Sequence, residues 1–355
     1  MGELVLGRKI GGKGMAWGLF FGTLPDLDIL FYPWLDQVEK LRWHRGISHS
    51  LLMMVVAAFV FAKPLAWLHR KKGVSARRAA WFVFLAWSTH VLIDVFTTYG
   101  TQIYEPFSDE RVALSNLFII DLFFTLPLLV WVLYRGVKGL IHVVKLIIWL
   151  LGNQEPDGRP EAEKFSMKGA TVTMLLSCLY VAFSLIMKVW AMDQIKGRMV
   201  EEIPNGEVVS VTPTPFNTIL WRGLIETEKG YFVTHWSPFD DGPAGYYFFL
   251  KQHELGEPFQ EEGMFKGLEW FSRGHWVARE TPDQEVEFID IRFGEVRDHE
   301  SRKLLPMFRW HLSYDDEGEF KASRPPRHVK MDDALSAIWK RLLGNRKDWE
   351  AMEAF

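Results

Sequence analysis

The chain has 355 residues, of which 48% are hydrophobic and 24% are charged, and its net charge is -3. This balance does not indicate a broad nucleic-acid-binding surface. The single cysteine, Cys178, excludes an internal disulfide framework and a cysteine-based zinc ribbon. Long apolar runs occur only before residue 196. We therefore expect a helical membrane domain at residues 1–195 and a second domain at residues 196–355.

Five segments are apolar over about 20 residues, the length that a membrane-spanning helix needs. In chain order they are Met15–Leu35, Ile47–Leu68, Arg78–Phe96, Leu114–Tyr134 and Gly169–Ala191. A shorter apolar stretch, Val137–Leu151, contains Lys138, His142 and Lys145, which favours an amphipathic helix in the membrane interface over a sixth span. The predicted fold of the first half is an α-helical multi-pass bundle of about five spans plus this interfacial helix.

Basic residues predict the orientation of the bundle. The segment His69–Arg78 contains five Lys or Arg residues and no acidic residue, so it should face the cytoplasm. With five spans, residues 36–46, residues 100–113 and everything after the fifth span then lie outside. We predict a multi-pass protein of the cytoplasmic (inner) membrane with an extracytoplasmic C-terminal domain. Three basic residues in the first outer loop depart from this pattern, and a functional role could explain them: Lys40, Arg42 and Arg45.

The second half alternates between apolar and polar residues over short runs, the pattern of half-buried β-strands. Such runs occur at residues 206–216, 218–227, 230–236, 245–252, 284–294, 305–314 and 319–323. A helix is predicted at Met331–Leu343. These elements predict a mostly antiparallel soluble domain of the α+β class.

Seven ionisable residues stand in or beside the apolar segments, where a charge at a helix centre costs roughly 2.5–3.5 kcal/mol. They are Asp26, Asp28, His44, His49, His90, Asp94 and Asp121. The predicted orientation brings all of them to the extracytoplasmic side of four different spans. This common placement indicates a functional cluster.

The residue types and spacings favour a metal. His90 and Asp94 are four residues apart and share one helix face. Imidazole and carboxylate groups are the usual ligands of zinc, manganese and iron(II). Gly46 suggests a turn that would let His44 and His49 point at one site. We expect a divalent metal, with zinc first and manganese or iron as alternatives, and the number of ions stays open.

Several of these residues, and Arg45 beside them, also have a structural interpretation. His90 and Asp94 could form a simple hydrogen-bonded pair, and Asp26 could cap a helix. Asp121 could bond a neighbouring helix, and Arg45 could extend its charge to the membrane surface. Because all seven ionisable residues are predicted on one side, a purely structural network is the weaker interpretation.

Three segments in this order resemble the YdjM-type family of inner-membrane metal-dependent hydrolases: PDLD at residues 25–28, HRGISHS at 44–50 and THVLIDVFTTYG at 89–100. The resemblance covers residues 2–127, and residues 213–222 and 289–294 are similar to the long members, which carry an extra C-terminal domain. It implies that the metal ligands are Asp26, Asp28, His44, His49, His90 and Asp94. Members commonly begin with a further stretch bearing a polar residue, often His, and here Glu3 stands near that place.

We therefore expect a membrane-embedded metal-dependent hydrolase, acting on a lipid or lipid-linked phosphoester at the outer face of the membrane. The metal would generate hydroxide from a bound water, Asp121 or Asp28 would act as general base, and Arg45 would hold the phosphate. The alternatives are a non-catalytic, metal-stapled assembly factor and, less favoured, an ion pathway. An ion pathway needs polar residues on both sides of the membrane, and the inner halves of the spans contain almost none. Lipid is the expected partner, nucleic acid is not, and the oligomeric state stays open.

Overall fold

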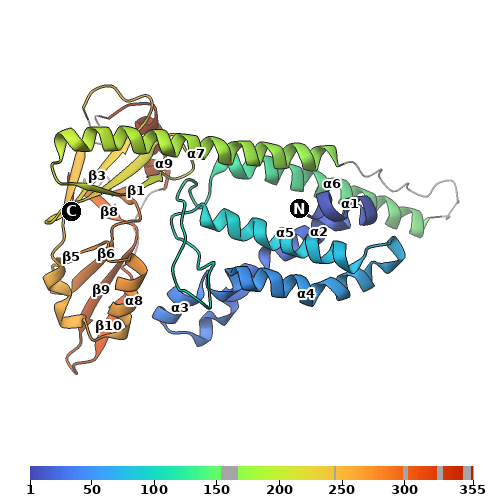
Figure 1. The fold of residues 1–355 in the computed structure, drawn as a ribbon, viewed down its shortest axis with the longest axis horizontal. Helices are drawn as coiled ribbons and strands as arrows, with labels where there is room; N and C mark the ends of the chain where they lie inside the picture. The colour runs from blue at the N-terminus through green and yellow to red at the C-terminus, as the bar shows by residue number, and fades with distance from the viewer. Residues whose placement is uncertain (153–166, 244, 299–302, 326–330, 347–352, 355) are drawn as a thin grey trace.

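The computed structural model describes residues 1–152, 167–243, 245–298, 303–325, 331–346 and 353–354. Figure 1 shows an elongated molecule with a helical bundle at one end and β-sheets at the other. Helix α7 (Lys168–Glu202) runs along the bundle and continues over the sheets. It therefore passes through residue 195, where the sequence predicted the domain boundary.

The bundle begins with two short helices in close contact, α1 (Gly2–Ile10) and α2 (Lys13–Thr23). A Cβ atom added at Gly2 would lie 1.8 Å from the carbonyl oxygen of Gly14. Only glycine permits this approach of the two backbones.

The predicted first span, Met15–Leu35, is not one continuous helix. Pro25 begins a separate 3-10 helix, η1 (Pro25–Trp34), where proline needs no N–H partner at the first helical position. The next helix, α3 (Gln37–Trp43), begins with a capping box formed by Asp36 and Glu39. The break places η1 and α3 beside the start of the second predicted span.

Three of the described helices are long and apolar enough to cross a membrane: α4 (Leu51–Leu68), α6 (Leu122–Leu151) and α7. Helix α5 (Ala76–Val95) has 20 residues and packs along α4, but it is not among the three. The predicted count of five spans is therefore not confirmed. Val137–Leu151 is the second half of α6, so the prediction of a separate interfacial helix there is wrong.

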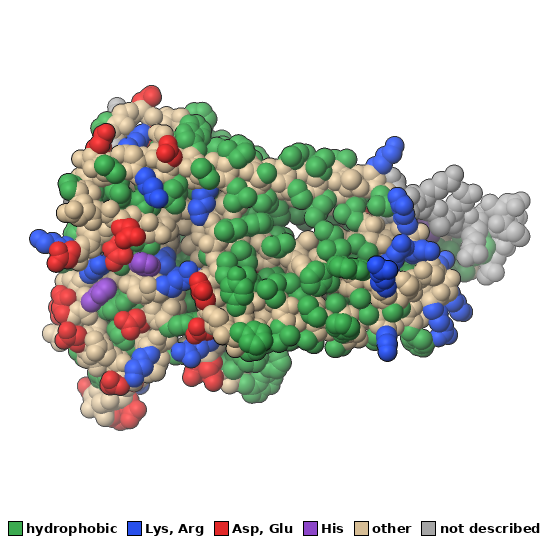
Figure 2. All heavy atoms as spheres, viewed as in Figure 1, with side chains coloured by type: hydrophobic (Ala, Val, Ile, Leu, Met, Phe, Trp, Pro, Cys, Tyr) green, Lys and Arg blue, Asp and Glu red, His purple; other side chains and the backbone are tan. Residues whose placement is uncertain are grey.

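The two ends of the bundle differ in charge. We call the end with residues 36–50 and 96–121 the sheet end, because it faces the β-sheets, and the end with η3 (Arg70–Lys72) the basic end. Figure 2 shows Lys and Arg side chains gathered at the basic end and a broad hydrophobic surface between the two ends. Helix α6 contributes to that surface, since it has no buried residue.

Two four-stranded antiparallel sheets form most of the C-terminal domain. The first has the order β1 (Glu207–Pro213), β2 (Trp221–Glu226), β3 (Gly230–Trp236), β4 (Tyr246–Leu250). The second has the order β10 (Phe320–Ser323), β9 (Arg309–Tyr314), β6 (Val286–Asp290), β5 (Trp276–Glu280). A third sheet consists of β7 (Glu295–Asp298), β8 (Lys303–Pro306) and β11 (Glu353–Ala354).

Three helices accompany these sheets: η5 (His253–Phe259), α8 (Gly263–Ser272) and α9 (Met331–Leu342). The seven predicted strands and the predicted terminal helix are all present. The expectation of an antiparallel, sheet-rich second domain is confirmed, although the sequence did not predict β5, β7, β8, β11, η5 or α8.

Two of the contacts between the C-terminal domain and the bundle involve apolar side chains. Helix α8 packs against α3, where a Cβ atom added at Gly267 would lie 2.5 Å from the side chain of Val38. Ile195 of α7 shares an apolar core with Trp221 and Trp236 of the first sheet. The loops of the sheet end, which carry several predicted site residues, therefore lie against the C-terminal domain.

Candidate metal centre

Three segments meet beside the sheet end, where four of the six predicted ligands lie. Asp26 is on η1, and His49 is on a short 3-10 helix, η2 (Ile47–His49). His90 and Asp94 are near the end of α5, on one face as their spacing predicted. Each of the three segments therefore supplies at least one ligand-type side chain.

These four side chains direct one ligand atom each at a common centre, and the atoms all lie within 4.8 Å of one another. Nε2 of His49 is 3.3 Å from Oδ1 of Asp26 and 3.2 Å from Oδ2 of Asp94. Nε2 of His90 is 3.4 Å from each of the same two oxygen atoms. The two Nε2 atoms are 3.2 Å apart.

These five distances match five of the six edges of a small coordination tetrahedron, and the sixth, between oxygen atoms of Asp26 and Asp94, is at most 4.8 Å. A metal bonded to nitrogen and oxygen at about 2.0–2.1 Å has tetrahedral ligand atoms roughly 3.3–3.4 Å apart. A cation would also offset the cost of desolvating two carboxylates at one place. The residues therefore fit a divalent metal ion, and their mixed nitrogen and oxygen donors suit zinc, manganese or iron(II).

Asp28 and His44 lie beside the four groups rather than among them. Nδ1 of His44 is 3.4 Å from the carboxylate of Asp28, which also accepts hydrogen bonds from the backbone N–H of Arg45 and the hydroxyl of Ser48. Oγ of Ser48 is 2.9 Å from Nδ1 of His49. If the Ser48 hydroxyl donates its hydrogen bond to Asp28, its oxygen accepts a hydrogen bond from Nδ1–H of His49. Nε2 of His49 then carries no proton and is free to bind a metal.

Arg45 is buried and turned toward Asp94. Its Nη2 is 3.0 Å from Oδ1 of Asp94, and its Nη1 donates a hydrogen bond to Oγ1 of Thr97 at 2.7 Å. Asp94 thus gives one oxygen to Arg45 and the other to the cluster. A positive φ of 58° at Arg45 makes the turn that the sequence predicted near Gly46. The guanidinium that was predicted to hold a phosphate is instead engaged within the protein, where it orients Asp94.

The sequence did not predict a role for Arg111, which fixes the backbone before this turn. Its buried guanidinium donates hydrogen bonds to the carbonyl oxygens of Leu41, His44 and Gly100. It also lies 5.3 Å from the ring of Trp270 on α8. Burial lowers the pKa of Arg111 to about 10. Its partners are backbone groups, and this kind of contact leaves no signal in a single sequence.

Asp121 lies outside the cluster. Its Oδ1 accepts a hydrogen bond from the backbone N–H of Phe124 and caps α6, while its Oδ2 accepts one from the hydroxyl of Tyr180 on α7 at 3.0 Å. The same hydroxyl is 3.0 Å from Oγ1 of Thr218, which precedes β2. Asp121 therefore makes a hydrogen bond to a neighbouring helix, as its structural interpretation from the sequence predicted.

Glu3 is also engaged elsewhere. Its carboxylate is buried and accepts hydrogen bonds from the indole of Trp131 at 2.7 Å and from Nε of Arg135 at 3.0 Å. These bonds join α1 to α6. Glu3 is therefore not a ligand of the cluster.

The cluster is accessible from the side of η1. The side chain of Asp26 is 48% exposed, whereas that of His49 is fully buried. Apolar residues of η1 next to Asp26 are more than 40% exposed: Leu27, Ile29, Leu30, Phe31 and Trp34. An exposed apolar patch of this kind is typical of contact with a membrane or a partner.

Residues 1–191 match the model of a family described as YdjM inner membrane protein. The chain belongs to this family. The match includes all four groups of the cluster and confirms the resemblance drawn from the sequence. The chain is also similar to an uncharacterized protein, YfhP, of Bacillus subtilis (strain 168). The two are 26% identical over 250 residues, which cover 65% of this chain and 66% of that relative. No solved structure matches the chain.

Proposed function

We propose that this YdjM family protein is a membrane-embedded, metal-dependent hydrolase acting on a lipid or lipid-linked phosphoester. The observation that carries the proposal is the convergence of four ligand atoms with five mutual distances between 3.2 and 3.4 Å. Bound there, a divalent metal would polarise a phosphoryl oxygen and lower the pKa of a bound water.

His44 is the residue we propose as general acid and base. Its Nδ1 faces the carboxylate of Asp28, and its side chain is 25% exposed. Among the described residues, no hydrogen bond occupies its Nε2. A carboxylate that orients an imidazole in this way prepares it to accept and return a proton. Asp28, itself a predicted base, would then act through His44.

The accessible side of the cluster supports a lipid substrate. Asp26 adjoins η1, on which Leu30 and Trp34 are 60% and 78% exposed. A headgroup could reach the cluster along η1 while its acyl chains stay in the bilayer.

The proposed orientation puts the cluster at the extracytoplasmic face. Basic residues favour the cytoplasmic side, and the basic end of the bundle lies opposite the C-terminal domain (Figure 2). Helix α5 would cross beside α4, and α2 with η1 would complete five passes. The chain would then be a multi-pass inner-membrane protein with a helical domain at residues 1–195 and an extracytoplasmic domain from residue 196.

A second candidate function is a metal-stapled assembly factor without catalysis. Four protein ligands around one ion are typical of structural zinc sites, whereas catalytic sites usually have three and a water. The exposure of Asp26 favours the hydrolase, because a ligand at an accessible edge can give way to water.

Turnover by the metal-loaded chain in detergent tests the proposal. The substrates are a phospholipid and a lipid-linked diphosphate in mixed micelles, with released phosphate or headgroup as the readout. We expect turnover that chelation abolishes and that His44→Gln lowers about 100-fold or more, while His142→Gln, on the second half of α6, leaves it unchanged. A chain that is fully loaded with metal but shows no turnover on any lipid would favour the non-catalytic assembly factor.

A further inference from the structure

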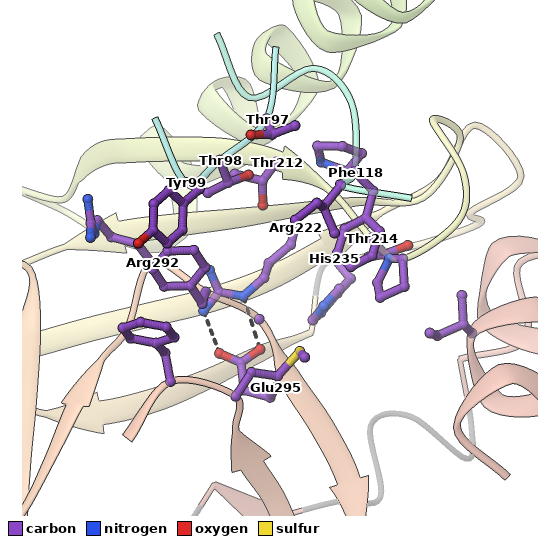
Figure 3. Close-up of a pocket in the computed structure, with 18 residues that line it drawn as sticks. Thr97, Thr98, Tyr99, Phe118, Thr212, Thr214, Arg222, His235, Arg292 and Glu295 are labelled. Atoms are coloured by element: carbon purple, nitrogen blue, oxygen red, sulfur yellow. Dashed lines mark hydrogen bonds and ion pairs between the residues drawn. The ribbon is translucent and has the colours of Figure 1, made fainter. Parts of the chain in front are cut away.

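A cavity of about 220 Å³ lies between the sheet end of the bundle and the C-terminal domain. Thr98 and Phe118 enter it from loops of the bundle, and Arg222 and His235 enter it from β2 and β3 (Figure 3). Most of the remaining wall is apolar. Both domains are therefore needed to form the cavity.

The cavity adjoins the expected membrane surface. Ile119 lines it and is 62% exposed, and the next residue, Ile120, is 54% exposed. Asp121, the cap of α6, follows directly, and α6 is one of the three candidate spans. An apolar molecule could therefore pass from the bilayer into the cavity along Ile119.

Arg222, which lines the cavity, has a buried hydrogen-bond donor without a partner among the described residues. Arg222 is 3% exposed, and its Nε and Nη2 bind the carboxylate of Glu295, with Nη2 also donating to the carbonyl oxygen of Ile291. Its Nη1 makes no hydrogen bond with any described residue. A buried donor left unpaired is costly, so a ligand that brings an acceptor to Nη1 is favoured.

The charges in the cavity are already balanced. Arg222 is paired with Glu295, and Arg292 is paired with Asp290, with Nε 2.9 Å from Oδ1. Burial beside two arginines lowers the pKa of His235 well below its usual value, which favours the neutral form of this side chain. The acceptor that suits Arg222 is therefore a neutral carbonyl rather than an anion.

We propose that this cavity binds an acyl chain of a bilayer glycerolipid, with the ester carbonyl accepting a hydrogen bond from Nη1 of Arg222. The cavity is separate from the metal cluster, and Thr97 and Tyr99 lie between the two. Both residues line the cavity, and both also contact residues around the cluster. Thr97 accepts the hydrogen bond from Arg45, and the ring of Tyr99 is 5.4 Å from that of His44. The proposal does not depend on the hydrolase activity.

Photo-crosslinking in lipid nanodiscs tests this site with the full chain. The probe is a phosphatidylcholine with a diazirine on one acyl chain, and labelled peptides are identified by mass spectrometry. We expect label on the peptides with residues 118–119 and 307–308, and excess unlabelled phosphatidylcholine should reduce it at least fivefold. Wild-type cavity peptides without label, or label that does not compete, would overturn the proposal.

A cavity-filling variant sharpens the test. A Cβ atom at Gly294 would meet only Cδ of Arg222, at 3.9 Å, so Gly294→Phe should fill the cavity without a backbone clash. We expect label on the cavity peptides to fall about tenfold, with label on α6 unchanged. Gly263→Phe is the matched control, because a Cβ there meets nothing within 4 Å. Equal labelling in a folded Gly294→Phe variant would contradict the proposal.

An acyl chain could come from a glycerolipid ester or from a free fatty acid. A free fatty acid with the same diazirine distinguishes these two sources. Because the cavity offers no unpaired positive charge, the ester probe should label the cavity peptides at least fivefold more than the free acid does. Stronger labelling by the free acid would overturn the assignment to an ester.

Discussion

Arg45 pairs with Asp94, one of the four proposed metal ligands, so its loss should weaken metal binding while these four residues remain. Removal of a group that holds a ligand typically costs 10- to 100-fold in metal affinity, and we expect a loss of about this size for Arg45→Met. Competition with a chromophoric chelator measures it. The control is Arg42→Met, since the Arg42 side chain stacks on Trp270 at 5.3 Å and not on a ligand. Equal affinities in the two variants would contradict this role.

Asp121 caps a helix, so its loss should lower stability and leave the metal site intact. We expect Asp121→Ala to reduce the free energy of unfolding by about 1 kcal/mol with unchanged metal content and turnover. Asp121→Asn keeps a capping side chain and should be milder. Thermal unfolding and turnover measured together decide the matter. Lost turnover at wild-type stability would instead support the catalytic role predicted from the sequence.

The sequence predicted which residues gather at the site better than it predicted the contacts that each of them makes there. Asp26 and Asp28 are equivalent in sequence, yet η1 directs Asp26 to the cluster and Asp28 to His44. Their difference depends on a 3-10 geometry that local composition does not specify. The contacts of Arg111 were unpredictable because they join backbone groups up to 70 residues away.

At the scale of elements, the contact between α3 and α8 should control how the C-terminal domain sits on the bundle. Gly267→Leu would force a side chain against Val38, so we expect faster hydrogen–deuterium exchange in residues 37–43. Val38→Ala should partly restore protection by making room. Gly263→Leu, on the same helix in open space, should have no effect. Wild-type exchange in Gly267→Leu would show that this contact does not hold the domain.

Elements were predictable where one local signal dominates. The alternation at Gly230–Trp236 corresponds to β3, and most of the predicted span Ile47–Leu68 corresponds to α4, which begins at Leu51. Prediction failed where signals compete. Met15–Leu35 is predominantly apolar, yet Pro25 begins a new helix within it. Val137–Leu151 contains lysines, yet nothing in it interrupts α6.

For the whole molecule, the proposed orientation predicts opposite labelling of its two ends. In a Cys178→Ala background, Lys229→Cys in the exposed turn between β2 and β3 should react with an impermeant maleimide in intact spheroplasts. Lys71→Cys, exposed at the basic end, should react only after permeabilisation. The reverse pattern would place the C-terminal domain in the cytoplasm, and with it the sheet end that carries the cluster.

The central claim is that η1, η2 and α5 together hold one metal ion, and metal X-ray absorption of the purified, loaded chain tests it most directly. We predict one ion per chain with nitrogen and oxygen ligands at about 2.0–2.1 Å, two of them imidazoles, and loss of this signal in His90→Ala. A wild-type chain without a stoichiometric ion, or a His90→Ala spectrum identical to that of wild type, would contradict the account.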